Sequence, residues 1–372
     1  MSSSGTGNRR RWLFRGLGIF AAPLVALLLV EGGARVLAAP AQAELTFNAP
    51  DNAPDGLYVN SHELGHRPTP GFEGVSISPG YRVDVRVNSL GLRGPEPGPD
   101  EGLERWLVTG DSFTFAVQVD EEQTFTALLA EGRETFNGGA DGYGTWQVLR
   151  QYRMLDDELG LDGLLVVFFT GNDLHDNERR SMVLHDAERR PDGSPMPSFR
   201  TPWWRRLLSQ HSYLHARWKV VQRTRALESG QGPDRQRWAR ELAIFTESGQ
   251  RDLDNLLKTT RPLLAELSRE TSERGDELLV AVSPPGFAVD PTRTAAAFSL
   301  VGHDPETATP RAPTDAVLAE LDALSVPSCD LHAPLDTAIS AGTRAYFDFD
   351  GHWTPEGHRI VADALEACLQ GP

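Results

Sequence analysis

From residue 105 onward, short apolar runs alternate with stretches of helical pattern, and this alternation most restricts the fold. The apolar runs are "RWLVTG" from 105, "TFNGG" from 135, "GLLVVFFTGND" from 163, "ELLVAVSPP" from 277 and "VPSCDL" from 326. Strands that are apolar without a break are buried on both faces, which is typical of parallel sheets. The pattern therefore predicts an α/β domain over 105–372, with a central parallel sheet between layers of helices.

Helical patterns lie between these strands at about 121–131, 145–158, 314–323 and 355–369. The last has the clearest start, because Thr354 can cap it and Pro355 suits its first turn.

A segment from about 175 to 275 interrupts the alternation. Residues 175–202 are polar and loop-like, and residues 203–275 hold two or more long helical patterns. The segment follows the carboxyl end of a strand, where open α/β sheets place their sites. We expect a helical insertion that acts either as a lid over the site or as an embellishment that only adds surface.

The first 43 residues have the features of an export leader. Three arginines precede an apolar run from Trp12 to Val30, which has Arg15 near its start and is about the length that a membrane helix needs. A signal anchor is therefore expected, and the alternative is a signal peptide cleaved after Ala43, where Ala41 and Ala43 form a small-x-small pattern. Both place the body outside the cytoplasm. A retained anchor would tie it to the inner membrane, with the body in the periplasm or at the cell surface, and cleavage of the leader would make it a secreted protein.

Residues 44–104 contain turns rich in proline and glycine around one alternating run. In that run Tyr81, Val83, Val85 and Val87 share a face, which predicts a strand in a small β-rich extension.

The whole chain has a formal net charge of −16, and without its first 43 residues 31 basic residues face 51 acidic ones. This acidic net charge argues against nucleic acid as a partner, because the body would repel phosphate groups. Its two cysteines, Cys329 and Cys368, can pair in an oxidising compartment or remain two buried thiols.

Three of the expected strands end in short polar motifs: "GDSF" at 110–113, "NGGADGYGT" at 137–145 and "TGNDL" at 170–174. The carboxyl ends of parallel strands meet at one edge of a sheet, so these motifs should converge. A fourth motif, "DFDGHWTPEGH" at 348–358, precedes the last helix and can reach the same edge.

The residue types in these motifs suit acyl transfer. Ser112 lies at the start of a helix, His352 can accept its proton, and Asp350 can orient the imidazole. The backbone N–H of Ser112, the backbone N–H of Gly142 and the side-chain amide of Asn172 can form an oxyanion hole. No cofactor or metal is needed.

This set resembles the GDSL, or SGNH, hydrolase family, named for a Ser, Gly, Asn and His in four blocks. Ser112, Gly142, Asn172 and His352 match these positions in order. The resemblance covers roughly residues 80–368 apart from the insertion. It implies a three-layer αβα, flavodoxin-like domain with a Ser-His-Asp mechanism.

The last block departs from the usual Asp-x-x-His pattern of the family, because position 349 is Phe. Asp350 is the expected acid, and Asp348 is the alternative. The form Asp-x-His-Trp resembles relatives that O-acetylate polysaccharides such as alginate. We expect Asp111 and Asp173 to hold turns, and His358 to pack or cap within the last helix.

The sequence therefore predicts an extracytoplasmic serine esterase that removes an acyl group, acetyl above all, from a carbohydrate. An O-acetyltransferase acting on a cell-envelope polysaccharide is the nearest alternative, although in the alginate-type relatives the Asp-x-His element precedes the serine. A noncatalytic glycan-binding protein is the third possibility.

A two-metal phosphoesterase is a further class, since "GD", "GND" and "DGH" resemble its metal-binding blocks. Position 114 is Thr, however, where that family has a second Asp. The residues Asp173, His175 and Asp176 can offer ligands, but a solvated loop is the simpler interpretation.

Overall fold

The computed structural model describes residues 54–196 and 233–371 except 79, 100, 348 and 349, together with residues 21 and 25–33 and scattered positions between 204 and 225. Residues 25–33 are helical. Among the residues described, no helix combines the length and the apolar character needed to cross a bilayer. Most of the expected leader lies outside the described residues.

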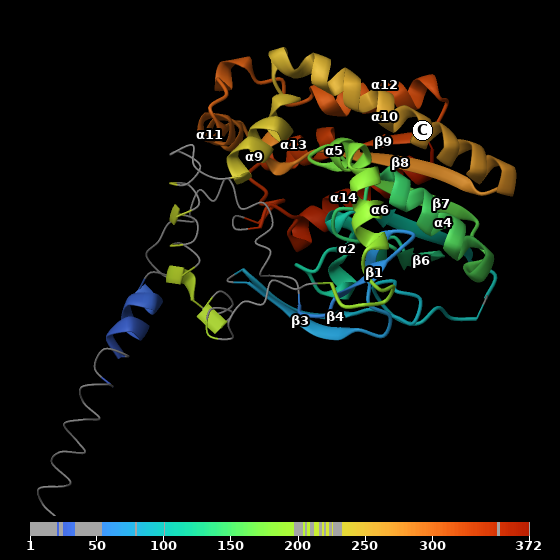
Figure 1. Cartoon of the computed structure of the whole chain (residues 1–372), viewed down its shortest axis with the longest axis horizontal. Helices are drawn as coiled ribbons and strands as arrows, with labels where there is room; N and C mark the ends of the chain where they lie inside the picture. Colours follow the sequence, from blue (N-terminus) through green and yellow to red (C-terminus); the bar gives the residue numbers. More distant parts are fainter. Residues whose placement is uncertain are drawn as a thin grey trace, which may run out of the picture.

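A five-stranded sheet forms the centre of the molecule (Figure 1). Its strands are β5 (Glu104–Gly110), β6 (Arg133–Asn137), β7 (Gly163–Phe169), β8 (Glu277–Ser283) and β9 (Ser328–Asp330). The order is β6-β5-β7-β8-β9, and every neighbouring pair is parallel. The parallel sheet expected from the apolar runs is thus confirmed.

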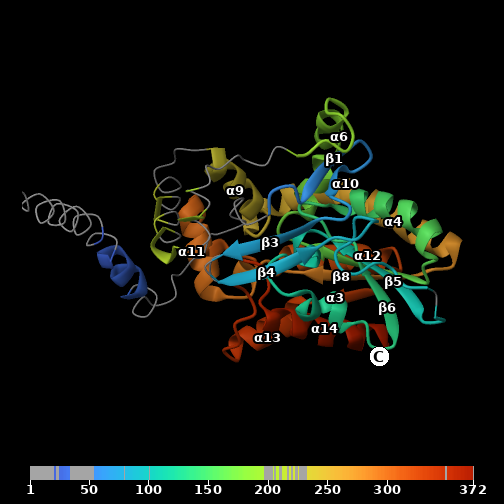
Figure 2. The ribbon, with the colours of Figure 1, turned by 90° about the horizontal axis from the view of Figure 1, so that it is seen from below.

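Helices cover both faces of this sheet, as Figure 2 shows. One face is covered by α4 (Thr145–Leu159), α10 (Gln250–Arg274) and α12 (Ala312–Ala323). The other face is covered by α3 (Phe125–Leu128), α13 (His332–Ser340) and α14 (Pro355–Leu369). The result is the expected αβα arrangement.

The central strand β7 shows why its sequence has no polar alternation. All seven of its residues are buried. Leu164, Val166 and Phe168 pack into the core beneath α4 and α10. Leu165, Val167 and Phe169 pack into the core beneath α13 and α14. Because successive side chains point to opposite faces, a strand covered on both sides must be apolar throughout.

The helix boundaries follow the sequence most closely where a cap is present. The Thr354 hydroxyl accepts a hydrogen bond from the N–H of Gly357 at 3.1 Å, and α14 begins at Pro355 as expected. The expected helix over 121–131 is wrong as a single element. A 3-10 turn, η1 (Glu121–Gln123), ends at Thr124, whose side chain then caps α3.

The middle segment is more helical than its polar sequence indicates. Instead of a loop, α5 (Asp173–Glu178) and α6 (Arg180–Glu188) follow β7 directly. Helix α9 (Pro233–Ala243) comes next among the described elements, and α10 then packs against α4, α5, α12 and β8. Helix α10 therefore belongs to the layer that covers the sheet. Further described elements of the domain are α11 (Pro291–Val301), η2 (Glu247–Gly249), η3 (Gly286–Ala288) and η4 (Pro305–Thr307).

The segment ahead of the sheet forms two antiparallel hairpins. The first pairs β1 (Tyr58–Ser61) with β2 (Gly65–Pro68), and the second pairs β3 (Glu73–Ser78) with β4 (Tyr81–Arg86). Val83, Val85 and Val87 are buried together against Phe115 and Val117, so the alternating run places one face inward as expected.

The two cysteines form a disulfide. Cys329 lies in β9 and Cys368 in α14, so the bond ties the last helix to the edge of the sheet.

Candidate active site

Ser112 lies where β5 turns into a four-residue helix, α2 (Ser112–Phe115). The turn requires Gly110, because a Cβ there would meet the carbonyl oxygen of Val167 at 2.6 Å and its φ is +156°. Asp111 caps the helix by accepting from the N–H of Phe113 at 2.9 Å. This sharp turn presents Ser112 at the carboxyl end of a central strand.

The structure brings Ser112, His352 and Asp350 together in one hydrogen-bonded row. Ser112 Oγ lies 2.8 Å from His352 Nε2, and Asp350 Oδ1 accepts from His352 Nδ1. Only 7%, 4% and 2% of the three residues remain exposed to solvent. The serine and the histidine are 240 positions apart in the chain, and the loop before α14 brings His352 next to Ser112. The row has the order nucleophile, base and orienting acid that acyl transfer requires.

Two further side chains hold Asp350 in place. The Tyr81 hydroxyl donates to Asp350 Oδ2 at 2.6 Å, and Gln118 Nε2 donates to Oδ1 at 3.2 Å. Sequence reasoning missed both residues, because Tyr81 was assigned only to a strand face and Gln118 to no role. These donors stabilise a buried carboxylate that would otherwise be costly.

The electrostatics of His352 suit a general base. Burial by itself would lower its pKa, but the charge and the hydrogen bond of Asp350 outweigh burial and raise the pKa above the ordinary value. Its ring lies 4.6 Å from the ring of Phe113, centroid to centroid. The fully buried Trp353 packs edge-on against the same phenylalanine at 4.9 Å. The Trp of the Asp-x-His-Trp motif thus supports the imidazole indirectly.

The three expected oxyanion donors have different surroundings. Within the described part of the chain, nothing accepts from the N–H of Ser112 or from that of Gly142. Gly142 has a φ of +68°, which favours glycine. The Asn172 side-chain amide donates one hydrogen bond to Asp176 Oδ2 at 2.7 Å, which leaves its second N–H for a ligand.

Arg93, which sequence reasoning also missed, contacts the carboxyl end of α2, the helix that begins at Ser112. Its guanidinium donates to the carbonyl oxygens of Phe115, Ala116 and Val119. Burial lowers its pKa to about 10, so it remains a cation. It therefore satisfies carbonyl groups at the end of α2 that the short helix leaves unpaired.

The residues expected to have structural roles do so. Asp173 Oδ2 accepts from the N–H of Phe169 at 2.9 Å and holds the turn after β7. Burial raises the pKa of Asp173, and it raises the pKa of Asp111 to about 7. His358 accepts from the N–H of Phe125 at 3.2 Å, and burial lowers its pKa to about 3. Asp348, the alternative acid, lies outside the described residues.

The candidate metal ligands after β7 do not gather around one point. Asp176 Oδ1 pairs with Arg179 at 3.2 Å, while its Oδ2 holds Asn172. Burial lowers the pKa of His175 to about 4. In the described portion of the chain, no group of three or more His, Cys, Asp or Glu side chains is arranged to hold a metal ion.

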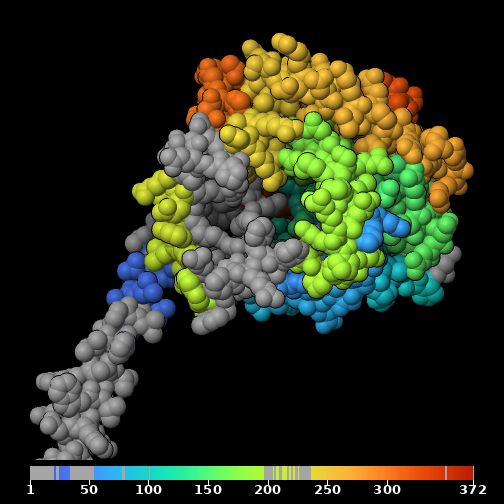
Figure 3. All heavy atoms as spheres, in the orientation of Figure 1, coloured from blue at the N-terminus to red at the C-terminus, as the bar shows by residue number. Residues whose placement is uncertain are grey.

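The surface is hollowed beside the helices that follow β7. Figure 3 shows this hollow next to the green atoms of α5 and α6, with teal atoms visible in its depth.

Comparison with known proteins gives one family match. Residues 244–371 match the model of the SGNH hydrolase-like domain of acetyltransferase AlgX. This segment contains Asp350, His352 and Trp353. No curated protein matches the chain.

Several solved structures show a remote likeness. An alpha/beta hydrolase from the metagenome of Lake Arreo, Spain, is 13% identical with a TM-score of 0.36, covering 72% of this chain and 95% of its own. A GDSL-like lipase from Bacteroides thetaiotaomicron is 12% identical with a TM-score of 0.36, covering 74% and 93%. An acetylxylan esterase from Geobacillus stearothermophilus is 13% identical with a TM-score of 0.34, covering 70% and 92%.

The family match and the site agree on the last block of the domain. The segment 244–371 supplies the histidine and its acid. The four signature residues occur in the family's order, at the ends of β5, β6 and β7 and before α14. Over residues 244–371 the chain is similar to the SGNH hydrolase-like domain, and the resemblance of the four motifs to the SGNH, or GDSL, hydrolases is consistent with this match.

Proposed function

We propose that this protein is an extracytoplasmic serine esterase that hydrolyses acyl esters, chiefly acetyl esters on a carbohydrate. The observation that carries the proposal is the row of hydrogen bonds from Ser112 through His352 to Asp350. The Asp-x-His-Trp motif and the match to an acetyltransferase family support acetyl as the acyl group.

The proposed reaction begins when His352 Nε2 removes the proton from Ser112 Oγ, which attacks the acyl carbon. The carbonyl electron pair moves to oxygen, where the N–H groups of Ser112 and Gly142 and the amide of Asn172 stabilise the charge. The intermediate collapses, the ester alcohol leaves with the proton from His352, and the acyl group remains on Ser112. Water then repeats the attack with His352 as base, and the carboxylic acid is released.

The acceptor of the acyl group distinguishes hydrolysis from transfer. An acyl-enzyme on Ser112 can pass its acyl group to water or to a glycan hydroxyl. The name of the matching family, an acetyltransferase, favours transfer as the second candidate. Incubation with an acetyl donor and a glycan acceptor separates the two, since hydrolysis yields acetate and transfer yields acetylated glycan.

The location is also proposed. The basic and apolar leader supports export and attachment to the inner membrane. The Cys329–Cys368 disulfide supports an oxidising compartment.

Replacing Ser112 with Ala tests the proposed function. We expect hydrolysis of p-nitrophenyl acetate to fall by at least roughly 10³-fold, because the nucleophile is removed. A fluorophosphonate probe should label the wild-type protein and leave the variant unlabelled. Ser272→Ala, at an exposed position of α10, is the matched control and should keep full activity and labelling.

The outcomes also decide between the other classes. Hydrolysis that persists at the wild-type rate in Ser112→Ala would refute the serine mechanism. A wild-type protein without labelling or turnover would indicate the noncatalytic glycan-binding class. We expect EDTA to leave turnover unchanged, and inhibition reversed by added metal would favour the phosphoesterase class.

A further inference from the structure

The first hairpin of the extension packs against the loop that carries Gly142. Leu64 is buried with Ala140 and Tyr143 in one small apolar cluster. The Tyr143 hydroxyl donates to the carbonyl oxygen of His66 at 2.8 Å. Gln147 Nε2 donates to the carbonyl oxygen of Leu64 at 3.1 Å. The hairpin is thus docked on this loop by several contacts.

Two side chains of the hairpin hold the backbone of Asp141, the residue before Gly142. His66 Nε2 lies 2.7 Å from the carbonyl oxygen of Asp141. The N–H of Asp141 donates to the Tyr58 hydroxyl at 3.1 Å. A carbonyl oxygen can only accept, so Nε2 of His66 carries the hydrogen. Burial lowers the pKa of His66, which keeps the ring neutral near pH 7.

The carbonyl of Asp141 and the N–H of Gly142 belong to the same peptide unit. This unit is planar and trans, so the two groups point in opposite directions. A donor fixed on the carbonyl therefore fixes the direction of the N–H. The same bond polarises the peptide and makes its N–H a stronger donor. Among the described residues nothing accepts from that N–H, and a Cβ at position 142 would meet no atom within 4 Å.

We propose that His66 is a positioning residue of the oxyanion hole: its Nε2–H bond to the Asp141 carbonyl aims and polarises the Gly142 N–H for the developing oxyanion. This inference rests on the proposed function. It makes the β-rich extension part of the catalytic apparatus. The hydrogen bonds from Tyr143 and Gln147 to the hairpin do not involve the imidazole, so the bond to Asp141 can be removed while these two hold the hairpin in place.

His66→Phe is the first test. The phenyl ring can keep the edge contacts that the imidazole makes with Tyr58 and Tyr143, whose ring centroids lie at 5.3 and 5.4 Å, but it cannot donate. We expect kcat for p-nitrophenyl acetate to fall about 10-fold to 100-fold with KM nearly unchanged, because the bond acts on the oxyanion. The inhibition constant of methylboronic acid, which forms a tetrahedral adduct on serine, should rise by a similar factor.

Two comparisons separate positioning from a structural role. His66→Gln can still donate to the carbonyl and should recover part of kcat and of the boronate affinity, whereas His66→Met should not. Arg150→Met removes another hydrogen bond to the same hairpin, from Arg150 Nη1 to the carbonyl oxygen of Glu63 at 2.9 Å, and should leave both values unchanged. If His66→Phe fails to fold, the Gln and Met pair decides the question.

The inference is overturned if folded His66→Phe keeps kcat and boronate affinity within about twofold of wild type, or if Gln and Met behave alike. It is also overturned if Arg150→Met loses as much activity as His66→Phe, because the effect would then come from docking. Failure of the proposed function looks different, since the wild-type protein itself would show no turnover and no serine labelling.

Discussion

The side chains that form the hydrogen-bonded row with Ser112 come from residues that are distant in the sequence. The imidazole of His352, the carboxylate of Asp350 and the hydroxyl of Tyr81 follow one another from the nucleophile outward. Each group fixes the orientation of the group before it. At the scale of residues, the site is therefore a chain of hydrogen bonds that ends in the extension.

The pH dependence of hydrolysis should report His352. The imidazole must be neutral to accept the serine proton, and Asp350 raises its pKa above the ordinary value of 6.5. We expect kcat/KM to rise with pH through a midpoint above 6.5 and to be lost as pH falls below it. Asp350→Asn should move this midpoint to lower pH and reduce kcat roughly 10³-fold to 10⁴-fold. A pH–rate profile of both proteins checks this, and an unmoved midpoint would contradict the pairing.

Tyr81→Phe should weaken catalysis without removing it. The change deletes the donor to Asp350 Oδ2 but leaves Gln118 on Oδ1. We expect kcat to fall about 3-fold to 30-fold at constant KM, since the carboxylate loses one of the groups that orient it. The free energy of unfolding should fall by about 1–3 kcal/mol, because a buried charge loses a hydrogen bond. Steady-state kinetics and urea unfolding measure the two effects, and unchanged kcat would show that Gln118 alone suffices.

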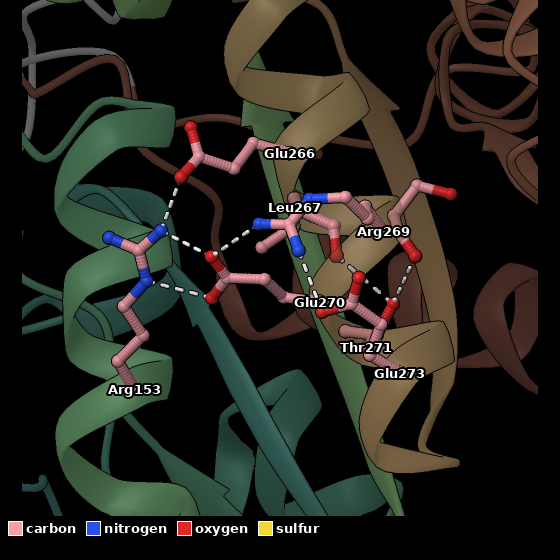
Figure 4. Close-up of polar contacts among 8 residues, drawn as sticks. Arg153, Glu266, Leu267, Arg269, Glu270, Thr271 and Glu273 are labelled. Atoms are coloured by element: carbon pink, nitrogen blue, oxygen red, sulfur yellow. Dashed lines mark hydrogen bonds and ion pairs between the residues drawn. The ribbon is translucent and has the colours of Figure 1, made fainter.

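At the scale of elements, the structure depends on contacts between helices on one face of the sheet. Arg153 of α4 contacts the carboxylates of both Glu266 and Glu270 of α10, as Figure 4 shows, and its Nε donates to Glu270 Oε2 at 2.7 Å. The side chain of Arg153 is 37% exposed and that of Glu270 is 12% exposed. The pair is therefore partly screened by water, and its contribution to stability is modest.

The Arg153–Glu270 pair should make stability depend on pH in one direction. The hydrogen bond from Arg153 lowers the pKa of Glu270 below its ordinary value of 4.5. A lowered carboxyl pKa stabilises the fold above the ordinary value, and this stabilisation is lost as pH falls through the lowered pKa. Arg153→Met should therefore reduce the free energy of unfolding by about 0.5–1 kcal/mol at pH 7, and the difference should shrink toward pH 3.

A double-mutant cycle of Arg153→Met with Glu270→Gln, measured by urea unfolding, isolates this pair. The more exposed pair Arg269–Glu273, with side chains 54% and 61% exposed, is the control and should show less coupling. Equal coupling in the two pairs, or no dependence on pH, would contradict the argument.

At the scale of the whole molecule, the extension and the sheet domain act together. The first hairpin contacts the loop that precedes α4, and the second reaches Asp350 through Tyr81. Arg93, just after the second hairpin, supports the helix of the nucleophile. Ser112, His352 and Asp350 lie in the sheet domain. Three residues that hold the site or its loops through hydrogen bonds precede residue 105, namely Tyr81, Arg93 and His66.

The proposed location is also a property of the whole chain. If the leader is a retained anchor, the full-length protein should remain in the membrane fraction after a high-salt wash, because an apolar helix is not released by ionic strength. Protease added outside spheroplasts should degrade the body, residues 44–372. Recovery of the protein in the soluble fraction with a new N-terminus after Ala43 would instead support a cleaved signal peptide, and protection from protease would refute export.

The sequence by itself determined the parallel sheet, the start of α14 and the order of the four site motifs. The physical reason is local, because burial on both faces requires continuous apolar runs, and parallel strands bring their carboxyl ends to one edge. Only the tertiary structure decided that Cys329 pairs with Cys368, that Tyr81 holds Asp350 and that His66 holds Asp141. Tyr81 and Asp350 are separated by 269 positions, and no periodicity in the chain encodes such a contact. It depends on where the two hairpins pack against the domain.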